Sequence, residues 1–393
     1  MFCADKYFDH AATTIVRKEA YVAMEPFLKE MFGNPASLHQ FGLQAKEAVE
    51  AARKTVAETI GASSKDLIFT GSGTESNNLA VLGAARRMRQ LGKGMHLVTS
   101  EVEHPSVREA MRALGREGFQ VTCVPVDSYG RVNPTDIRAA IRPNTVLISI
   151  MHANNVTGTI QPIQDIGKIA REQGVLFHCD AVQSYGKLPL HVDDLQVDLL
   201  TLNAHKIGGP KGVAALYVRK GVRLDPILYG GGQERGLRPA TLHTAGIVGF
   251  AKAAVLAVQD QAAEWERMTR LRSRLVERLK QTIPGFTVNG FTRGSGLEDR
   301  GVEGLPHILN ISIARIEGQA LMLELDRFGF ATSSGSACSA TDHEPSYVLL
   351  AMGRSRDAAL ESLRISMGRT TTEESVDQLA SALEQAAKQW RSG

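Results

Sequence analysis

Short apolar runs alternate with helix-like segments through the first half of the chain. Strand-like runs fall at 67–69, 96–99, 121–126, 145–151, 175–180, 198–202 and 213–218, and segments with helical spacing lie between most of them. This alternation is typical of a mainly parallel sheet with helices on both faces. The sequence therefore predicts an α/β fold.

A different pattern follows the last of these runs. One long helical stretch is predicted from about 244 to 282, followed by strands at 308–313 and 363–367 and helices at 318–328 and 373–390. A length of 393 residues suits two domains. We expect a large domain over residues 15–260, and a smaller α+β domain formed by residues 1–14 and 261–393.

Composition limits the classes of partner and compartment. The chain is 43% hydrophobic and carries a net charge of +3, so neither nucleic-acid nor membrane binding is expected. No apolar run approaches the ~18 residues of a membrane span, and the first residues lack the pattern of a signal peptide. The four cysteines lie far apart, at 3, 123, 179 and 338, so no metal site and no disulfide are expected. These features predict a cytoplasmic location.

A lysine and an aspartate stand where two of the predicted strands end. Lys206 follows an apolar run and precedes glycines and a proline, and such a lysine can form a Schiff base with an aldehyde cofactor. A lone lysine on a loop is more often a surface residue, so the other strand ends decide the interpretation. Asp180 terminates an apolar strand and is costly to bury without a cation, which a protonated pyridine nitrogen would supply. Gln183 follows one helical turn later.

Three further strand ends carry groups that fit the same chemistry. A glycine turn containing Gly73 and Thr74 opens a helix and can cradle a phosphate, although an ordinary capped helix fits equally well. Its glycines do not make a dinucleotide fingerprint, because Ser76 stands where the third glycine belongs. His104 could stack on a ring or move protons, and Asn155 could hold a carboxylate or a phenolic oxygen.

Nine short motifs occur in an order that resembles the cysteine desulfurases. These are pyridoxal 5′-phosphate enzymes of fold type I and of the class-V aminotransferase family, in the NifS/IscS group. The motifs are ATT (12–14), GNPAS (33–37), GTES (73–76), EHP (103–105), NN (154–155), DAVQ (180–183), HK (205–206), GGGQERG (230–236) and SSGSAC (333–338).

The resemblance implies a role for each matching residue. Lys206 would bond the cofactor covalently, His104 would stack on its ring, Asp180 would pair with the ring nitrogen, and Gln183 would meet the phenolic oxygen. The cofactor phosphate would be bound by a further set, namely Gly73, Thr74, Asn203, His205 and, from the other subunit of a homodimer, Thr241. The substrate carboxylate would be held by Asn34, Asn155 and Arg364, and the last of these is suited to bidentate binding.

Cys338 distinguishes the desulfurase reaction from the other reactions that this fold supports. It lies in a small, polar run over residues 333–343, which predicts a mobile loop and an exposed nucleophile rather than a buried cysteine. The resemblance implies that its thiolate takes the sulfur of L-cysteine, giving L-alanine and a persulfide that is passed to a sulfur-acceptor protein. The same fold could instead support a selenocysteine lyase or a transaminase, and an inactive scaffold homologue is the alternative from another class.

The sequence departs from the family pattern at three places. Asn203 replaces a commoner serine, and Val156 stands where an acidic residue usually follows the second asparagine. Residues 238–241 (RPAT) replace a commoner small-Gly-Thr ending. Together with Gln233 and residues 307–310, this RPAT segment resembles the sequences of the cysteine desulfurase branch that serves DNA phosphorothioation. Iron–sulfur assembly, thiolation and DNA sulfur modification all stay open as the destination of the sulfur.

Overall fold

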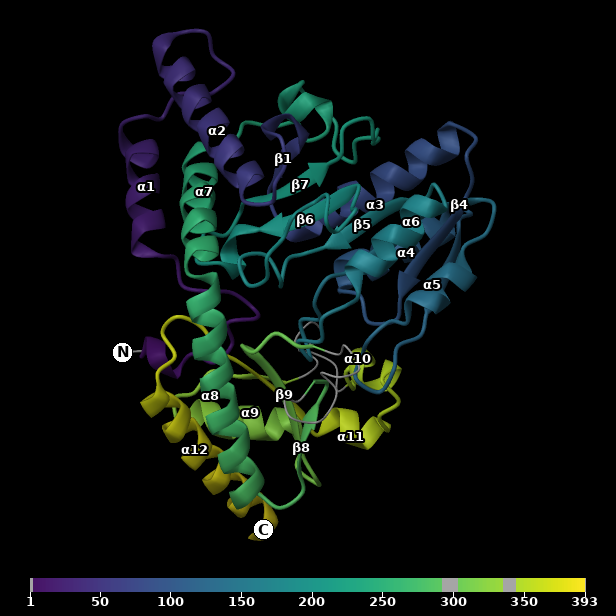
Figure 1. Cartoon of the computed structure of the whole chain (residues 1–393). Coiled ribbons are helices and arrows are strands. Elements are labelled where there is room, and N and C mark those ends of the chain that lie inside the picture. Colours follow the sequence, from purple (N-terminus) through teal and green to yellow (C-terminus); the bar gives the residue numbers. More distant parts are fainter. Residues whose placement is uncertain (1–2, 292–302, 335–343, 393) are drawn as a thin grey trace.

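The structure is a computed structural model that describes residues 3–291, 303–334 and 344–392. It contains a seven-stranded sheet and a four-stranded sheet, each with its own helices (Figure 1). The N-terminal half of the chain builds the larger sheet, and most of the C-terminal part builds the smaller one.

The large sheet has the order β1-β7-β6-β5-β4-β2-β3. Its strands are β1 (Leu67–Thr70), β2 (His96–Ser100), β3 (Gln120–Val124), β4 (Thr145–Met151), β5 (Leu176–Asp180), β6 (Leu199–Asn203) and β7 (Ala214–Val218). Only β7 runs antiparallel to its two neighbours, β1 and β6; the other pairs are parallel. The prediction of a mainly parallel sheet is confirmed.

Helices cover both faces of this sheet because its strands are buried on both sides. All seven residues of β4 are buried, as expected for a central parallel strand. One face packs on α3 (Gly73–Gln90) and α4 (Pro105–Arg116). The other face packs on α2 (Gln40–Glu58), α5 (Pro134–Ala140), α6 (Ile163–Glu172) and α7 (Thr244–Gln259), and α1 (Lys18–Lys29) lies outside α7. Cys179 is part of this core and is fully buried, and burial raises the pKa of its thiol.

The prediction of one continuous helix over 244–282 is wrong in one detail. Two helices, α7 and α8 (Gln261–Thr282), are separated by Asp260. The ψ of Asp260 is −7°, far from the value of about −42° in an α-helix, so the backbone is distorted there, although Asp260 still donates to Leu256 and accepts from Glu264 through its backbone. Figure 1 shows that α7 lies against the large sheet and α8 against the small one.

The small sheet is antiparallel, with the order β10-β11-β9-β8. Its strands are β8 (Phe286–Asn289), β9 (Ile308–Ile313), β10 (Ser333–Ser334) and β11 (Ser362–Ser366), and its helices are α8, α9 (Gly318–Arg327), α10 (Tyr347–Ala351), α11 (Arg356–Leu360) and α12 (Glu373–Ser392). The N-terminal segment joins this region, since Phe8 is buried in the same core. The two cores support the proposed division into two domains, whose boundaries stay a prediction.

The loop predicted over 333–343 begins differently from expectation. Ser333 and Ser334 form β10, because they pair with Arg364 and Leu363 of β11. The remaining residues of that loop, including Cys338, lie outside the described residues.

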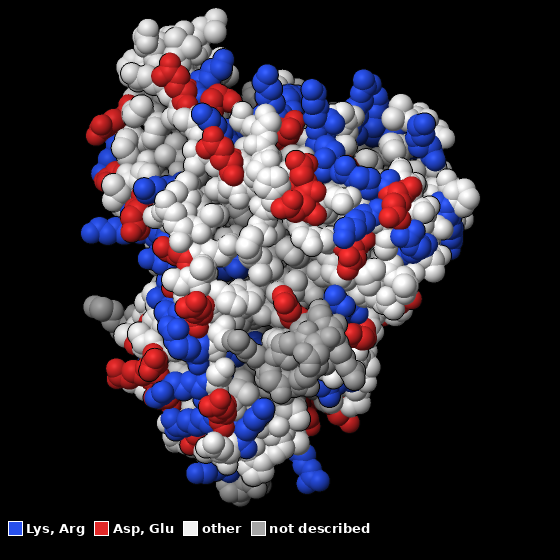
Figure 2. All heavy atoms as spheres, viewed as in Figure 1, with Lys and Arg blue, Asp and Glu red and all other residues white. Residues whose placement is uncertain are grey.

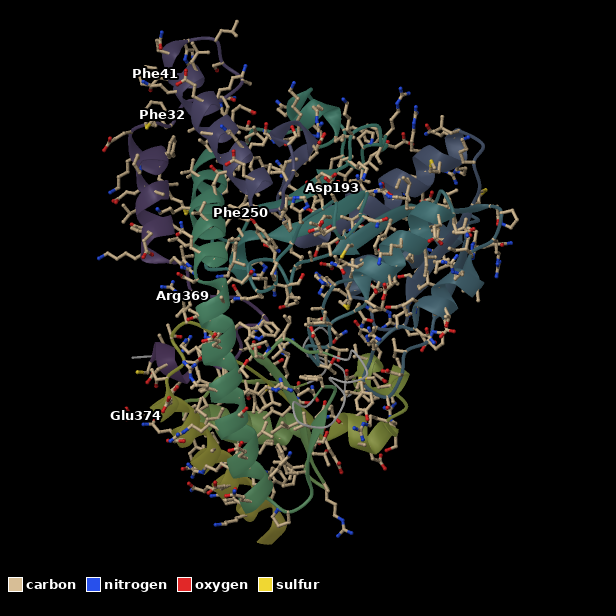
Figure 3. All side chains as sticks on the ribbon, viewed as in Figure 1. Phe32, Phe41, Asp193, Phe250, Arg369 and Glu374 are labelled. Carbon is tan, nitrogen blue, oxygen red and sulfur yellow. The ribbon has the colours of Figure 1, made fainter. Side chains whose placement is uncertain are left out.

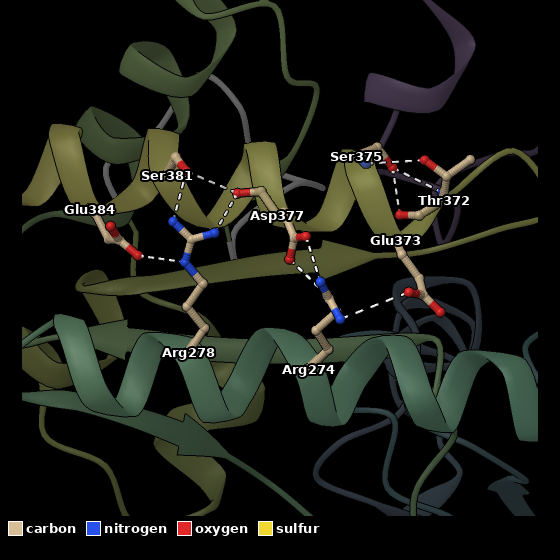
Figure 4. Close-up of polar contacts among 8 residues, drawn as sticks. All are labelled: Arg274, Arg278, Thr372, Glu373, Ser375, Asp377, Ser381 and Glu384. Atoms are coloured by element: carbon tan, nitrogen blue, oxygen red, sulfur yellow. Dashed lines mark hydrogen bonds and ion pairs between the residues drawn. The ribbon is translucent and has the colours of Figure 1, made fainter.

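Ion pairs on the surface join the first and last helices of the small domain. Arg274 and Arg278 of α8 pair with Asp377 and Glu384 of α12 at 2.7 and 2.9 Å (Figure 4). Basic and acidic side chains are interspersed over this part of the surface (Figure 2). Among the described residues, no helix combines the length and the hydrophobicity needed to cross a membrane.

Candidate active site

Six strands of the large sheet, all except β7, end at one edge, and predicted site residues follow five of them. β1 is parallel to β6, since both are antiparallel to β7, and β2, β4, β5 and β6 are parallel to one another. Ligands of open α/β sheets bind at this edge. The segments that follow these strand ends carry nine of the predicted residues: Gly73, Thr74, His104, Asn155, Asp180, Gln183, Asn203, His205 and Lys206.

Lys206 is held by backbone oxygens of the N-terminal segment. Its Nζ donates to the carbonyl oxygens of Ala11 at 2.5 Å and Ala12 at 2.6 Å, and Gln183 Nε2 donates to the Ala11 oxygen at 3.0 Å. Thr14 fixes the segment, because its hydroxyl donates to the carbonyl oxygen of His205 at 2.7 Å and accepts from a backbone N–H beyond the lysine. The ATT motif is visible in the sequence, but the sequence does not predict the contact between this segment and Lys206.

Asp180 and His104 are joined by two residues that sequence reasoning missed. Asn77 Nδ2 donates to Asp180 Oδ2 at 2.7 Å and to Ser106 Oγ at 2.8 Å. Ser106 Oγ lies 2.7 Å from His104 Nδ1, and the backbone N–H of Ser106 also donates to that nitrogen. His104 Nδ1 is therefore an acceptor, and the proton of a neutral ring lies on Nε2. The signal was present in the sequence, since Asn77 lies one helical turn beyond the Gly73 turn.

Charges at the strand ends influence the His104 ring. Burial lowers the pKa of His104, the Asp180 carboxylate opposes this shift, and the Lys206 ammonium lowers the pKa further. Both charges thus act on the ring, which is consistent with three groups that face a common space. Asp180 is 5% exposed, and its carboxylate accepts hydrogen bonds from the Asn77 amide and from the backbone N–H of Val182 at 2.9 Å. A buried carboxyl group whose other partners are neutral donors is suited to pair with a cation.

The start of α3 offers free backbone donors. Ser72 Oγ accepts from the N–H of Glu75 at 3.1 Å, and the Glu75 carboxylate accepts from the N–H of Gly71. The N–H groups of Gly73 and Thr74 precede the first bonds within the helix. A Cβ on Gly73 would lie 3.0 Å from Asn203 Nδ2, so glycine permits close packing at this turn.

Two polar side chains of β6 and its following turn complete this side of the site. Asn203 is 5% exposed, and its Oδ1 accepts from the N–H of His205 at 3.3 Å. His205 Nδ1 lies 3.1 Å from Thr13 Oγ1. Burial, together with the charges of Lys206 and Lys211, lowers the pKa of His205 to about 4, so the ring is neutral at pH 7. Neutral donors and free N–H groups around a glycine turn fit a phosphate ester.

Arg364 approaches the same edge from the small sheet. Its Nη2 pairs with Asp9 Oδ1 at 2.8 Å, and its Nη1 donates to the carbonyl oxygen of Asn155 at 3.0 Å. Arg364 Nε and Asn155 Oδ1 are buried without a hydrogen-bond partner among the described residues. Unsatisfied polar atoms on two residues that contact each other fit the binding of a small polar ligand. The partner Asp9 was not predicted.

Two predicted residues are not part of this cluster in the single chain. Asn34 is exposed in the loop between α1 and α2, where its Oδ1 accepts from the N–H of Ala36 at 3.0 Å. Thr241 is exposed in the segment before α7, next to Ala240, whose φ is +124°. Alanine is strained at such a φ, which glycine adopts freely. Both residues stay predictions, as does Cys338, which lies outside the described residues.

Comparison with known proteins agrees with this geometry. The model of the family "Aminotransferase class-V" matches residues 6–379. Cysteine desulfurase IscS from Anaeromyxobacter sp. (strain Fw109-5) is 52% identical over 374 residues, covering 94% of this chain and 89% of the relative. A solved NifS-like protein superposes with a TM-score of 0.89 at 37% identity, covering 98% of this chain and 99% of the other. DndA from Streptomyces lividans gives 0.76 at 37% identity, with coverage of 90% and 97%.

The matched region extends over nearly the whole chain and includes both sheets. The predicted resemblance and the predicted fold are therefore confirmed. The chain belongs to the class-V aminotransferase family, a family that depends on pyridoxal phosphate, and within it the chain is a homologue of the cysteine desulfurases.

Proposed function

We propose that the protein is a cysteine desulfurase that uses pyridoxal 5′-phosphate to convert L-cysteine to L-alanine and leaves the sulfur on Cys338. The observation that carries this proposal is the convergence of Lys206, His104 and Asp180 at one sheet edge, with Arg364 reaching it from the small sheet. When bound, the cofactor acts as an electron sink for the amino acid.

The residues at the strand ends fit each part of this cofactor. Lys206 would hold its aldehyde carbon, Asp180 would pair with its ring nitrogen, His104 would stack on the ring, and Gln183 and Asn155 would meet the phenolic oxygen. Its phosphate would be bound by the N–H groups at the start of α3 and by polar side chains, namely Thr74, Asn203, His205 and, across a dimer interface, Thr241. The close packing of Gly73 against Asn203, where a Cβ would lie 3.0 Å from Nδ2, supports this assignment.

Arg364 would bind the substrate carboxylate together with Asn155, and Asn34 would add a further contact. The guanidinium is 5% exposed and already oriented by Asp9, so little conformational entropy is lost when the substrate binds. Lys206, once released from the cofactor, would accept the Cα proton at Nζ. The two carbonyl oxygens beside Nζ would orient the amine for that transfer.

Cys338 would complete the reaction as a thiolate. Its sulfur forms a bond to the sulfur of L-cysteine, the substrate C–S bond breaks, and a proton replaces sulfur on the substrate carbon. The products are L-alanine and a Cys338 persulfide, so atoms and electrons balance without an added oxidant or reductant. The persulfide would then pass to a sulfur-acceptor protein. The higher identity to IscS than to DndA, 52% against 37%, favours an IscS-type acceptor over DNA phosphorothioation.

A homodimer accounts for exposed apolar side chains on the large domain. Leu38, Tyr229 and Phe32 are 90%, 86% and 71% exposed. Phe32 and Phe41 lie together at the outer end of α1 and α2 (Figure 3). Burial of such a surface against a second copy is favourable, and it would complete the phosphate site with Thr241.

The decisive experiment compares two cysteine variants of the cofactor-loaded protein. With L-cysteine as substrate and a dithiol to reduce the persulfide, the wild type should form alanine and sulfide in equal amounts, and Cys338→Ser should form neither. Cys123 is also exposed, so Cys123→Ser is the matched control and should keep full activity. Full sulfur release by Cys338→Ser would contradict the proposal. Amino transfer to a keto acid, or turnover of selenocysteine alone, would favour the alternatives on the same fold.

Replacement of Lys206 by alanine tests the cofactor site directly. The variant should lose the visible absorbance of the lysine-bound cofactor and all measurable turnover, because the covalent anchor and the proton acceptor are both lost. Lys211→Ala is the control, since this exposed lysine lies five residues away on the following loop. Normal absorbance in Lys206→Ala would refute the assignment.

A further inference from the structure

A cavity of about 200 Å³ lies where the two sheets and their helices meet. Lys206 and Gln183 line one side of it, but His104, Asp180 and Asn203 do not, so the cavity is distinct from the strand-end cluster. Its walls come from both parts of the molecule: residues 14–18, 186–187 and 257–260 on one side, and residues 261–268, 306–307 and 367–370 on the other. Figure 3 shows the position of Arg369 beside the junction of α7 and α8.

Basic side chains outnumber acidic ones in this cavity. Besides Lys206, the basic residues are Arg17, Lys18, Lys187 and Arg369, and the acidic residues are Asp260 and Glu264. Both acids already have arginine partners. Arg17 Nη1 lies 2.7 Å from Asp260 Oδ2, and Arg267 binds both carboxylate oxygens of Glu264 at 2.9 Å.

Within the described residues, Lys187 has no counter-ion, and neither do the exposed Lys18 and Arg369 at the edge of the cavity. The Nζ of Lys187 has no hydrogen bond and no ion pair within the described ranges, although protein surrounds it and its side chain reaches the open space of the cavity. Burial lowers the pKa of Lys187 to about 8, and the Glu264 carboxylate only partly opposes this. At pH 7 the amine is therefore mostly protonated. A partly buried ammonium without a counter-ion is unfavourable, so an anion would be bound readily here.

The other titratable groups of the cavity do not supply that anion. Burial lowers the pKa of His10 to about 4 and that of His307 well below its ordinary value, and the charge of Lys187 contributes to both shifts. Both rings are thus neutral at pH 7 and can act as hydrogen-bond partners. Arg369 is exposed at the edge of the cavity, and no ion pair or hydrogen bond of its side chain occurs in the part of the chain that the structure describes.

We propose that this cavity binds a small dianionic oxyanion between the two domains, with Lys187 as the partly buried cation and Arg369 as the contact from the small domain. Lys187 and Arg369, neither of which has a counter-ion in the described part of the chain, together match a double negative charge, and the volume admits one tetrahedral ion with a few waters. The ion would join residues from both sides of the α7–α8 junction. It would therefore stabilise one relative orientation of the two domains.

The test measures binding of inorganic phosphate and of sulfate to the cofactor-loaded protein by calorimetry, at pH 7 and constant ionic strength. Loaded cofactor keeps the phosphate-binding positions around Thr74 occupied, so any heat reports a second site. We expect saturable binding by the wild type, a loss of at least about tenfold in affinity for Lys187→Met, and a smaller loss for Arg369→Gln. Lys220→Met, a change at an exposed lysine, is the matched control and should bind as the wild type does.

Thermal unfolding separates binding from the general effect of these salts. Phosphate and sulfate stabilise most proteins weakly by exclusion from their surface, so the informative quantity is the difference between wild type and variants. Equal melting shifts in all four proteins, with no saturable heat, would overturn the proposal. Binding of acetate as tightly as phosphate would also overturn the dianion assignment. If Lys187→Met does not fold, Arg369→Gln decides the outcome alone, because its side chain is exposed.

Discussion

Two ion pairs of nearly equal length illustrate how the large and small domains differ. Arg53 and Glu234 of the large domain are 2.6 Å apart, and their side chains are 10% and 2% exposed. Arg274 and Asp377 of the small domain are 2.7 Å apart, with 49% and 36% exposed. Water screens the second pair and not the first. The contribution of each ion pair to stability is therefore expected to depend on its burial and not on the distance between its atoms.

The largest effect on stability is expected at the buried pair. Glu234→Gln should lower the free energy of unfolding by about 3–5 kcal/mol, because Arg53 would lose its buried counter-ion and keep only the exposed Glu50 as an acidic partner. The Glu234 carboxylate also accepts from the N–H of Phe69 at 2.6 Å. Urea denaturation measures the change. Glu50→Gln removes an exposed partner of the same arginine and is the control. A similar loss in both variants would contradict the role of burial.

A smaller effect is expected where the buried network reaches the active site. Asn77→Leu removes the donor shared by Asp180 and Ser106, and cofactor affinity should fall roughly 10–100-fold, as for a lost hydrogen bond to a charged group. Fluorescence titration of the apo-protein with pyridoxal phosphate measures this. Asn78→Leu is the neighbouring control, since Asn78 Nδ2 donates to two backbone carbonyls. Unchanged affinity in Asn77→Leu would show that Asp180 needs no such support.

Acid should lower the free energy of unfolding through His178, which lies in the large sheet. The ring is fully buried between Ser149 Oγ and Thr201 Oγ1, and burial lowers its pKa to about 3. In the unfolded chain the His178 ring binds a proton near pH 6.5, whereas in the folded chain burial keeps it neutral at that pH. The free energy of unfolding therefore decreases as the pH falls below about 6.5. Between pH 7 and pH 5 the loss should be ~2 kcal/mol. His178→Gln should flatten the pH dependence of urea midpoints, whereas replacement of the exposed His191 should leave it unchanged.

The smallest effect is expected at the exposed pair. Asp377→Asn should change the free energy of unfolding by less than about 1 kcal/mol, because the Arg274–Asp377 contact is exposed to water. The effect should shrink further at 1 M salt, where the screening length is about 3 Å. A loss as large as that of Glu234→Gln would remove the distinction between the two regions.

The sequence predicts the strand ends of the large sheet well because parallel strands impose a simple rule. Asp180 and Lys206 each follow a buried apolar run, and parallel strands bring such residues to one edge. The contacts that orient them depend on tertiary packing. Asp9 meets Arg364 across 355 positions of sequence, and no local pattern marks that pair.

The elements that were missed are short or only partly buried. β8 has one fully buried residue of four, so it shows little of the apolar alternation that identifies a strand. β10 is two serines long and becomes a strand only because β11 offers it a partner. Asn77 was missed for a different reason. An asparagine inside a helix is usually a solvent-facing residue, and its role depends on the buried carboxylate that it meets.

The path of the N-terminal segment has a mechanical consequence. Phe8 belongs to the core of the small domain, whereas Arg17 forms an ion pair with Asp260 at the end of α7. With the proposed boundaries, the chain passes between the domains only near residues 11–17 and at residue 260. Two bodies tethered at two points can turn only about the line that joins the tethers. One tether carries the carbonyl oxygens that hold Lys206, so any such rotation would act directly on the catalytic amine.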